Sequence, residues 1–221
     1  MLIAFEGIDG SGKTIQSLAL KKRIEDQGLA SSLFSFPAYE TPVGQLIFNH
    51  LHDKNQAFAL DPQIVSILYA TNRMEMRSKI LDALKRNQIV ICNRYTYSNV
   101  AFQGAKVDLE NQPEFISWIE ELEFKTFQLP RPDLVVLLLL PPSRAARLIA
   151  AKKDQTKQGP DQYERNREFL QKVYDIYQRI CNSRDSWIPI QCDSGKEILS
   201  KEKITNLVSD AVIPFIEKKG L

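Results

Sequence analysis

The stretch MLIAFEGIDGSGKT, Met1 to Thr14, decides the fold of this chain. Its apolar residues Leu2 to Phe5 predict a buried strand, glycines follow within a few residues, and a helix is expected to begin at Lys13. Backbone N–H groups at a helix N-terminus curl around an anionic phosphate when no Cβ blocks them, and glycine has no Cβ. The sequence therefore predicts a phosphate-binding loop between a strand and a helix.

The loop suits a nucleoside triphosphate and its metal ion. Lys13 is placed to reach the β- and γ-phosphates as a point charge, and the Thr14 hydroxyl is placed to bind Mg²⁺. The alternative is a tight strand-to-helix turn with a solvated lysine. We expect the whole loop to bind ATP, through Gly7, Ile8, Asp9, Gly10, Ser11, Gly12, Lys13 and Thr14.

Composition limits the class of protein. The 221 residues, 43% of them hydrophobic, are enough for the core of one α/β domain over residues 1–221. A net charge of +2, from 29 basic and 27 acidic residues, argues against nucleic acid and membranes as partners. The three cysteines lack CxxC or metal-ligand spacing, and the longest apolar run, Leu134 to Leu140, is too short to span a bilayer. We expect a cytoplasmic protein.

Strand and helix patterns alternate along the chain. Further strands are predicted over 31–36, 88–92, 133–140 and 187–191, helices over 15–27, 42–51, 62–86, 113–127, 144–152, 161–182 and 201–219, and a mobile loop over 153–162. Several strands are apolar throughout, which favours an α/β fold with a parallel sheet covered on both faces. Ligands of such sheets bind beyond the carboxyl ends of the strands, so residues 9–14, 37–41 and 93–103 are expected to form one crevice.

Five stretches then carry a resemblance to a known family. FEGIDGSGKT at 5–14, FPAYETPVG at 36–44, NRYTYSNVAFQGA at 93–105, LPRPDLV at 129–135 and DQYE at 161–164 together resemble thymidylate kinase. The resemblance implies a three-layer P-loop NTPase fold, with a five-stranded parallel sheet and a mobile lid at about 152–162. It also implies transfer of phosphate from Mg-ATP to dTMP in dTTP synthesis, commonly by a homodimer.

The resemblance assigns the catalytic roles to Lys13, Arg94 and Asp9. Arg94 would hold the acceptor phosphate, and Asp9 would lie by the acceptor's 3′-hydroxyl and, with Thr14, by the metal. An arginine fork suits a phosphate dianion better than lysine does, which makes the role of Arg94 chemically reasonable. A phosphate oxygen is already nucleophilic at neutral pH, so no separate base is required.

The resemblance also implies an acceptor site. Tyr69 would stack on thymine, Arg73 would hydrogen-bond its carbonyl, and Asn99 would face the base edge. Phe102 would crowd a 2′-hydroxyl. The expected substrate-binding residues are Asp9, Phe36, Pro37, Tyr39, Tyr69, Arg73, Arg94, Asn99, Phe102, Gln103, Tyr163 and Glu164.

Structural alternatives stay open for several of these side chains. Tyr69 and Phe102 would also suit plain core packing, and Arg94 a structural salt bridge. Arg73 lies in a charged stretch that is typical of surface ion pairs, and Asn99 would suit a helix cap. Glu164 would also suit a solvated helix face.

The chain departs from the family pattern at three places. Asn93 stands where the family has a carboxylate, so Mg²⁺ is expected to be held less tightly or through other groups. Ala38 and Tyr39 stand where many members carry an arginine. The lid contains no arginine, and Gly10 supplies none from the loop. Candidates for the missing charge are Lys152, Lys153, Lys157, Arg147 and Arg165.

Two rival functions remain at this point. One is a P-loop kinase of another nucleotide or of a deoxynucleoside. The other is a catalytically weakened nucleotide-binding protein built on the same fold. A helical face with Ile64, Leu68 and Ile80 is a candidate dimer surface.

Overall fold

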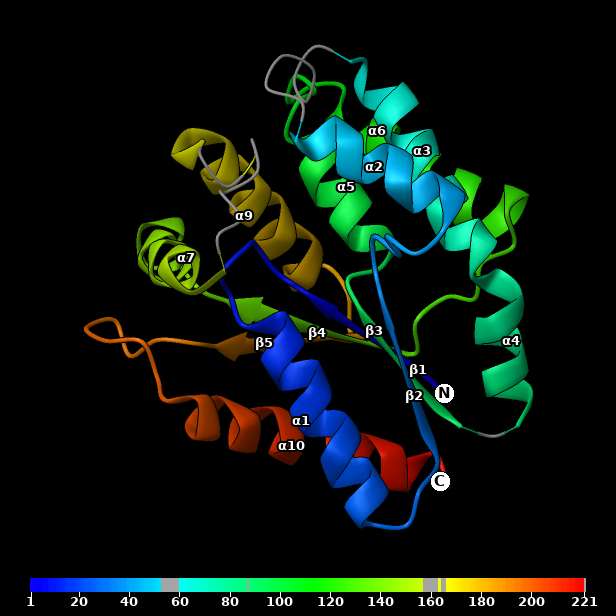
Figure 1. Cartoon of the computed structure of the whole chain (residues 1–221), viewed down its shortest axis with the longest axis vertical. Helices are drawn as coiled ribbons and strands as arrows, with labels where there is room; N and C mark the ends of the chain where they lie inside the picture. The colour runs from blue at the N-terminus through cyan, green and yellow to red at the C-terminus, as the bar shows by residue number, and fades with distance from the viewer. Residues whose placement is uncertain (53–59, 87, 157–162, 164–165, 221) are drawn as a thin grey trace.

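The centre of the molecule is a parallel sheet of five strands, in the order β2-β3-β1-β4-β5 (Figure 1). The computed structural model describes residues 1–52, 60–86, 88–156, 163 and 166–220, with side chains described outside 150–156. Its strands are β1 (Leu2–Glu6), β2 (Ser31–Ser35), β3 (Ile89–Asn93), β4 (Leu134–Leu139) and β5 (Trp187–Gln191). The predicted α/β fold with five parallel strands is confirmed.

Burial follows the apolar runs in the sequence. Every residue of β1 and β4 is buried, as are the first four of β3, whereas the edge strands β2 and β5 are partly exposed. Strands that are apolar on both faces need a cover on each side. The central strands therefore require helices on both faces of the sheet.

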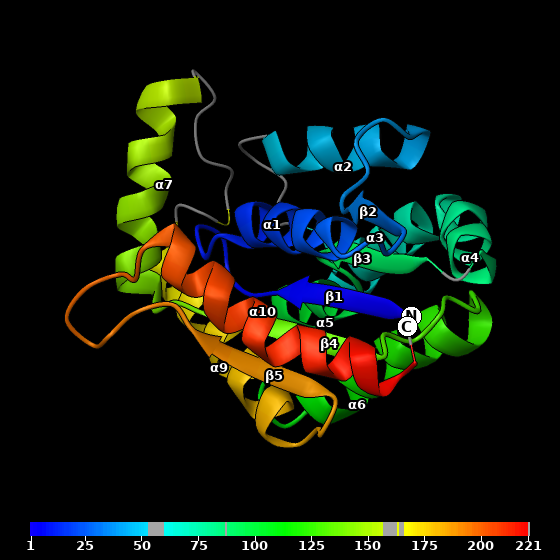
Figure 2. The same cartoon turned by 90° about the horizontal axis from the view of Figure 1, so that it is seen from below.

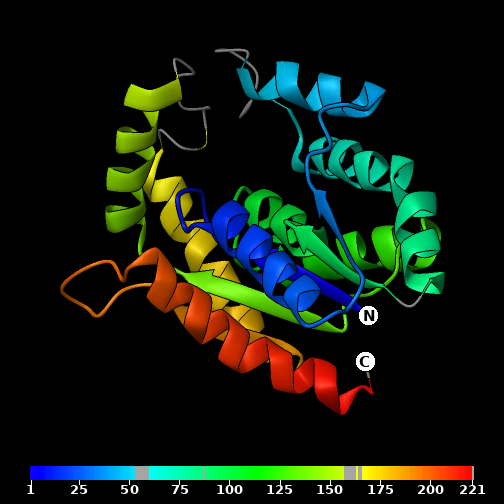
Figure 3. The same ribbon diagram turned by 60° about the horizontal axis from the view of Figure 1, so that its bottom comes forward.

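Helices supply these covers. The helices α1 (Lys13–Asp26) and α10 (Lys201–Lys218) pack side by side on one face, and α5 (Thr96–Gly104) and α9 (Arg167–Asn182) on the other (Figure 3). The helices α3 (Pro62–Glu75) and α6 (Gln112–Glu120) pack against α5. The remaining helices are α2 (Pro42–His52), α4 (Arg77–Lys85), the π-helix η1 (Glu121–Thr126) and α7 (Pro142–Thr156). The chain termini lie close together at the amino end of β1 (Figure 2).

Capping residues start helices where the sequence predicts. The Asp61 carboxylate accepts a hydrogen bond from Gln63 N at 2.7 Å, at the start of α3. The Thr41 hydroxyl accepts one from Gly44 N at 3.0 Å, at the start of α2. Both groups satisfy backbone N–H donors that lack an intrahelical partner.

Other element predictions were wrong. No helix was predicted at α5, where all nine residues are buried, the polar Thr96, Asn99 and Gln103 among them, so the segment lacks the solvent-facing side of an amphipathic helix. The expected helix 62–86 breaks at Met76, where the apolar pattern has no interruption, and Ile80 is buried in the core rather than on a dimer face. The helix α7 continues to Thr156 through residues expected to be loop. The rest of the expected lid and most of the predicted start of the helix over 161–182 lie outside the described residues, and α9 begins at Arg167.

Candidate functional site

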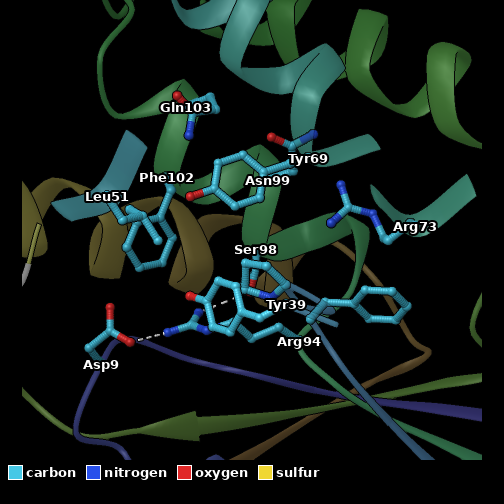
Figure 4. A pocket seen from close by; sticks show the side chains of 12 residues that line it. Asp9, Tyr39, Leu51, Tyr69, Arg73, Arg94, Ser98, Asn99, Phe102 and Gln103 are labelled. Atoms are coloured by element: carbon cyan, nitrogen blue, oxygen red, sulfur yellow. Dashed lines mark hydrogen bonds and ion pairs between the residues drawn. The ribbon is translucent and has the colours of Figure 1, made fainter. Parts of the chain in front are cut away.

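A cavity opens at the carboxyl end of the sheet, where the sequence predicts the crevice (Figure 4). It is lined by Asp9, Phe36, Pro37, Tyr39, Leu51, Tyr69, Arg73, Arg94, Ser98, Asn99, Phe102 and Gln103. The three segments that follow β1, β2 and β3 therefore meet in one place. Of the expected acceptor residues, Tyr163 is not in the lining, and Glu164 lies outside the described residues.

The glycine loop is shaped by close backbone contacts. Gly7 has φ +139°, and a Cβ there would lie 2.7 Å from the carbonyl oxygen of Leu138. The Nζ of Lys13 donates hydrogen bonds to the carbonyl oxygens of Gly7 at 3.0 Å and Ile8 at 2.8 Å. These contacts hold the buried lysine against the loop backbone, with its charge near the N-terminus of α1, a position suited to an anion.

The helix α7 packs against the same loop. A Cβ at Gly10 would lie 2.9 Å from the carbonyl oxygen of Ala145, and Gly10 has φ +79°. Both facts disfavour a side chain at position 10 in this arrangement of the loop and α7, since a Cβ would require one of them to shift. Among the other candidates for the missing positive charge, Arg147 is exposed on α7. The side chains of Lys152 and Lys153, and all of Lys157 and Arg165, lie outside the described part of the chain.

Arg94 joins the glycine loop to the cavity. Its φ of +65° is unusual for a residue with a Cβ and directs the side chain back toward β1. The guanidinium donates to the Gly7 carbonyl oxygen at 3.2 Å and to Ser98 Oγ at 3.0 Å, and forms an ion pair with Asp9. The Arg94 and Asp9 side chains are 15% and 22% exposed and line the cavity, so this ion pair is open to a ligand.

The charge on Arg94 is secured by its neighbours. Burial by itself lowers the pKa of the guanidinium. The negative charges of Asp9 and Glu6, with the Asp9 hydrogen bond, outweigh that effect and raise the pKa above its ordinary value. Arg94 is therefore a permanent cation at the end of the cavity next to the loop.

Glu6 is a buried residue that the sequence prediction missed. Its carboxylate accepts hydrogen bonds from Tyr95 N at 2.9 Å, Ser98 N at 3.0 Å, Ser98 Oγ at 2.5 Å and Tyr177 OH at 2.9 Å. These contacts cap the N-terminus of α5, which has no side-chain cap of its own, and hold Ser98 against Arg94. Burial raises the pKa of Glu6. A carboxylate within an apolar strand was the only signal in the sequence.

Asn72 is a second missed residue. It is buried on α3, and its side-chain oxygen accepts a hydrogen bond from Ala38 N at 2.8 Å. Its Nδ2 donates to the Ala38 carbonyl oxygen at 3.2 Å and to Thr41 Oγ1 at 2.8 Å. A Cβ at Gly44 would lie 1.9 Å from the same carbonyl oxygen. Together these contacts hold residues 37–41 at the edge of the cavity.

Tyr69, Asn99 and Arg73 lie farther from the glycine loop (Figure 4). Arg73 is only 2% exposed and forms a two-point ion pair with the buried carboxylate of Glu123, so the surface ion pair considered for Arg73 is excluded. Asn99 lies inside α5 rather than at its end, so its side chain is not a helix cap. Its Nδ2 donates at 3.0 Å to the Ser66 carbonyl oxygen and at 3.0 Å to Glu123 Oε1.

Phe102 belongs to an aromatic cluster at the side of the cavity. The Arg94 guanidinium lies 5.1 Å from the centre of its ring, and Tyr163 and Phe169 pack edge-on behind it at 5.8 and 6.1 Å. Tyr163 is 2% exposed, and its hydroxyl accepts a hydrogen bond from Lys106 Nζ at 2.8 Å. In this structure Tyr163 therefore packs against the Phe102 ring and does not itself line the cavity.

Oxygen ligands for a hard cation gather beside the loop. Asn93 Nδ2 donates to Thr14 Oγ1 at 3.2 Å, while Asn93 Oδ1 is buried and has no partner among the described residues. Asp9 lies on the same loop as Thr14. No group of three or more His, Cys, Asp and Glu side chains suited to a metal occurs in the described part of the chain. The donor set therefore fits a cation held through few protein ligands, as Mg²⁺ with bound triphosphate is.

Comparisons with known proteins agree with this geometry. A family model described as thymidylate kinase matches residues 5–203. A thymidylate kinase of Arabidopsis thaliana is 37% identical over 221 residues, covering 100% of this chain and 75% of that protein. One of Danio rerio is 30% identical over 220 residues, covering 99% and 93%. The solved thymidylate kinase of Candida albicans superposes with a TM-score of 0.73 at 25% identity, covering 96% and 91%.

Proposed function

Because this chain belongs to the thymidylate kinase family, we propose that it transfers the γ-phosphoryl group of Mg-ATP to dTMP and releases dTDP and ADP. The observation that carries this proposal is the Asp9–Arg94 pair. It joins a triphosphate-binding loop to an aromatic-lined cavity, and it presents an arginine fork between them. A donor phosphate and an acceptor phosphate would meet at this pair.

The chain's own residues would work by positioning and by charge. Lys13 would hold the β- and γ-phosphates, and Arg94 would hold the acceptor phosphate. The attacking phosphate oxygen needs no general base. The two histidines, His50 and His52, lie on α2 outside the cavity lining, which agrees with a reaction of this kind.

The acceptor's base would occupy the far part of the cavity. Tyr69 would cover one face of the pyrimidine ring, while Arg73, Asn99 and Gln103 would meet its polar edge. Phe102 would stand against the sugar.

Magnesium is the cofactor that this proposal requires. Thr14, Asp9 and the unpartnered oxygen of Asn93 would bind it, directly or through water. The ion supplies charge neutralisation between the transferred phosphoryl group and its leaving group.

A coupled ADP-release assay tests the proposal. It compares dTMP with dUMP, dCMP, dGMP, UMP and thymidine, using the wild-type protein and the variants Lys13→Ala and Asn93→Asp. We expect turnover largely confined to dTMP, loss of turnover in Lys13→Ala, and equal or higher turnover in Asn93→Asp.

Two outcomes would contradict the proposed function. Faster turnover of another acceptor would indicate a kinase of that nucleotide or nucleoside. ATP binding by calorimetry without turnover of any acceptor, in the wild type and in Asn93→Asp, would indicate a nucleotide-binding protein.

We also propose that the protein is a cytoplasmic homodimer. On α3, Ile64, Ile67 and Met74 are 58%, 44% and 41% exposed and lie on one helix face, which is an apolar surface suited to a second copy of the chain. Light scattering of the wild type and of Ile64→Glu tests the dimer.

The proposed location rests on the cysteines. All three are buried and free, which suits a reducing compartment. No helix within the described ranges is long and apolar enough to cross a membrane.

A further inference from the structure

The carboxylate of Glu123 lies directly behind the wall of the cavity. It is fully buried and accepts four hydrogen bonds, two from Arg73, one from Thr96 Oγ1 at 2.7 Å and one from Asn99 Nδ2 at 3.0 Å. The Arg73 bonds run from Nε at 2.6 Å and from Nη2 at 2.5 Å. Glu123 itself does not line the cavity. Two of its partners, Arg73 and Asn99, do.

Glu123 and the Ser66 carbonyl oxygen together determine which way the Asn99 amide points. An ionised carboxylate accepts hydrogen bonds but donates none, and the same is true of the Ser66 carbonyl oxygen, the other partner of Asn99 Nδ2. Both neighbours require the amide nitrogen, so the amide oxygen must point away from them. Asn99 Oδ1 is buried and has no partner among the described residues, although Asn99 lines the cavity. The wall therefore presents a hydrogen-bond acceptor at this position.

Glu123 also determines which part of Arg73 is available. It engages Nε and Nη2, which leaves the Nη1 group for the cavity that Arg73 lines. The Arg73 side chain is only 2% exposed, so its positive charge would be unfavourable there without a counter-charge. The ion pair with Glu123 supplies that counter-charge. The same carboxylate thus fixes a donor and an acceptor on one wall.

The element that carries Glu123 is unusual. Glu123 lies in η1, a π-helix of six residues that directly follows α6. Short π-helical segments occur mostly as local bulges, frequently at functional sites. An α-helical continuation of α6 would place residue 123 at a different angle around the helix axis. The wide turn of the π-helix therefore helps to direct the Glu123 carboxylate toward Arg73 and Asn99.

We propose that Glu123 is a positioning residue that sets the hydrogen-bond polarity of the base site and thereby its preference for a 4-oxo pyrimidine. The proposal rests on the proposed function. A base with an N–H donor beside a carbonyl oxygen, as in thymine or uracil, matches an acceptor on Asn99 and a donor on Arg73. Cytosine presents an unprotonated ring nitrogen and an amino group in the same places. It would set acceptor against acceptor and donor against donor.

Glu123→Gln tests the proposal, with Glu121→Gln as the matched control. Glu121 lies on the same π-helix, but its side chain is 57% exposed and pairs with Lys125. In either orientation the glutamine amide nitrogen faces a donor of Arg73, so the guanidinium is no longer held by two acceptors. In one orientation the same nitrogen also faces Asn99 Nδ2, and the Ser66 carbonyl oxygen is then the remaining acceptor for that amide. We expect the ratio of dTMP to dCMP, in kcat/KM and in calorimetric Kd, to fall about ten- to hundredfold in Glu123→Gln. Glu121→Gln keeps the wild-type ratio.

The conservative variant Glu123→Asp separates polarity from a merely structural role. It keeps a carboxylate, which accepts hydrogen bonds and donates none, next to Arg73 and Asn99. We expect it to keep most of the preference for dTMP even where it lowers the Tm. It is also the deciding variant if Glu123→Gln alone does not fold.

The outcomes separate the two proposals. A wild-type protein that binds dTMP no better than dCMP would remove the proposed function. A wild type that prefers dTMP, together with a Glu123→Gln variant that keeps the preference, would overturn the role of Glu123 alone. So would a folded Glu123→Asp variant without preference for dTMP.

Discussion

Removal of the Glu6 carboxylate is the perturbation whose effect follows most directly from the contacts. Glu6→Ala removes four buried hydrogen bonds, two from backbone N–H groups and two from hydroxyls. At about 1 kcal/mol for each bond, the free energy of unfolding should fall by about 4 kcal/mol. For a chain of this size that corresponds to a fall in Tm of roughly 8 to 16 °C.

Glu6→Gln is the matched control. Its side-chain oxygen can keep the bonds from Tyr95 N and Ser98 N, while its amide nitrogen donates to a hydroxyl that turns to accept. We therefore expect a loss within about 1 kcal/mol. Urea unfolding followed by tryptophan fluorescence measures both variants. Equal losses in Glu6→Ala and Glu6→Gln would refute the hydrogen-bond argument.

The pH dependence gives a second check on Glu6. Burial raises the pKa of Glu6 above its usual 4.5, so in the window above that value the folded chain binds more protons than the unfolded chain. This contribution to stability is present at lower pH and is lost as the pH rises through the folded pKa. Glu6→Gln should lack this loss, and its stability relative to the wild type should rise with pH there. A difference that does not change with pH would contradict the assignment.

Three further predictions follow from single contacts. Gly44→Ala should lower the free energy of unfolding by at least about 2 kcal/mol, because the new Cβ would overlap the Ala38 carbonyl oxygen. Urea unfolding measures this loss, and an unchanged midpoint would contradict the close approach. Arg94→Lys should lower kcat/KM for dTMP about tenfold or more with little change in Tm, because lysine cannot make the fork; parallel losses in Tm would indicate a structural role. Burial lowers the pKa of Lys106 to about 8, so between about pH 8 and 10.5 the unfolded chain binds more protons and stability should rise with pH. Lys106→Gln should lack that rise in urea titrations, and an equal rise in both proteins would exclude Lys106 as its source.

Local sequence was a good guide to the elements that have a strong pattern. The apolar runs at 2–5 and 134–139 and the helix starts at 42 and 62 were located correctly, because a buried strand and a capped helix each leave a signal within a few residues. The helix α5 was missed for the opposite reason. All its residues are buried, so its polar residues do not mark a solvent-facing side, and the segment differs from the pattern of a surface helix.

Sequence motifs were a good guide to which residues line the cavity and a poor guide to what holds them. Arg73 and Asn99 were expected there. Glu123, which holds both of them, was not, because it lies 24 residues from Asn99 and 50 from Arg73 in the sequence. Glu6 and Asn72 were missed in the same way. Supporting residues of this kind have no characteristic spacing, because their partners are near only after folding.

The sequence alone determined the phosphate-binding loop and the parallel sheet, because a helix N-terminus without Cβ atoms and strands that are apolar on both faces are local properties of the chain. Tertiary structure decided which hydrogen-bonding groups the cavity wall presents. The direction of the Asn99 amide depends on a buried carboxylate and a backbone carbonyl oxygen from other elements, and an amide has no preferred direction until its neighbours are in place.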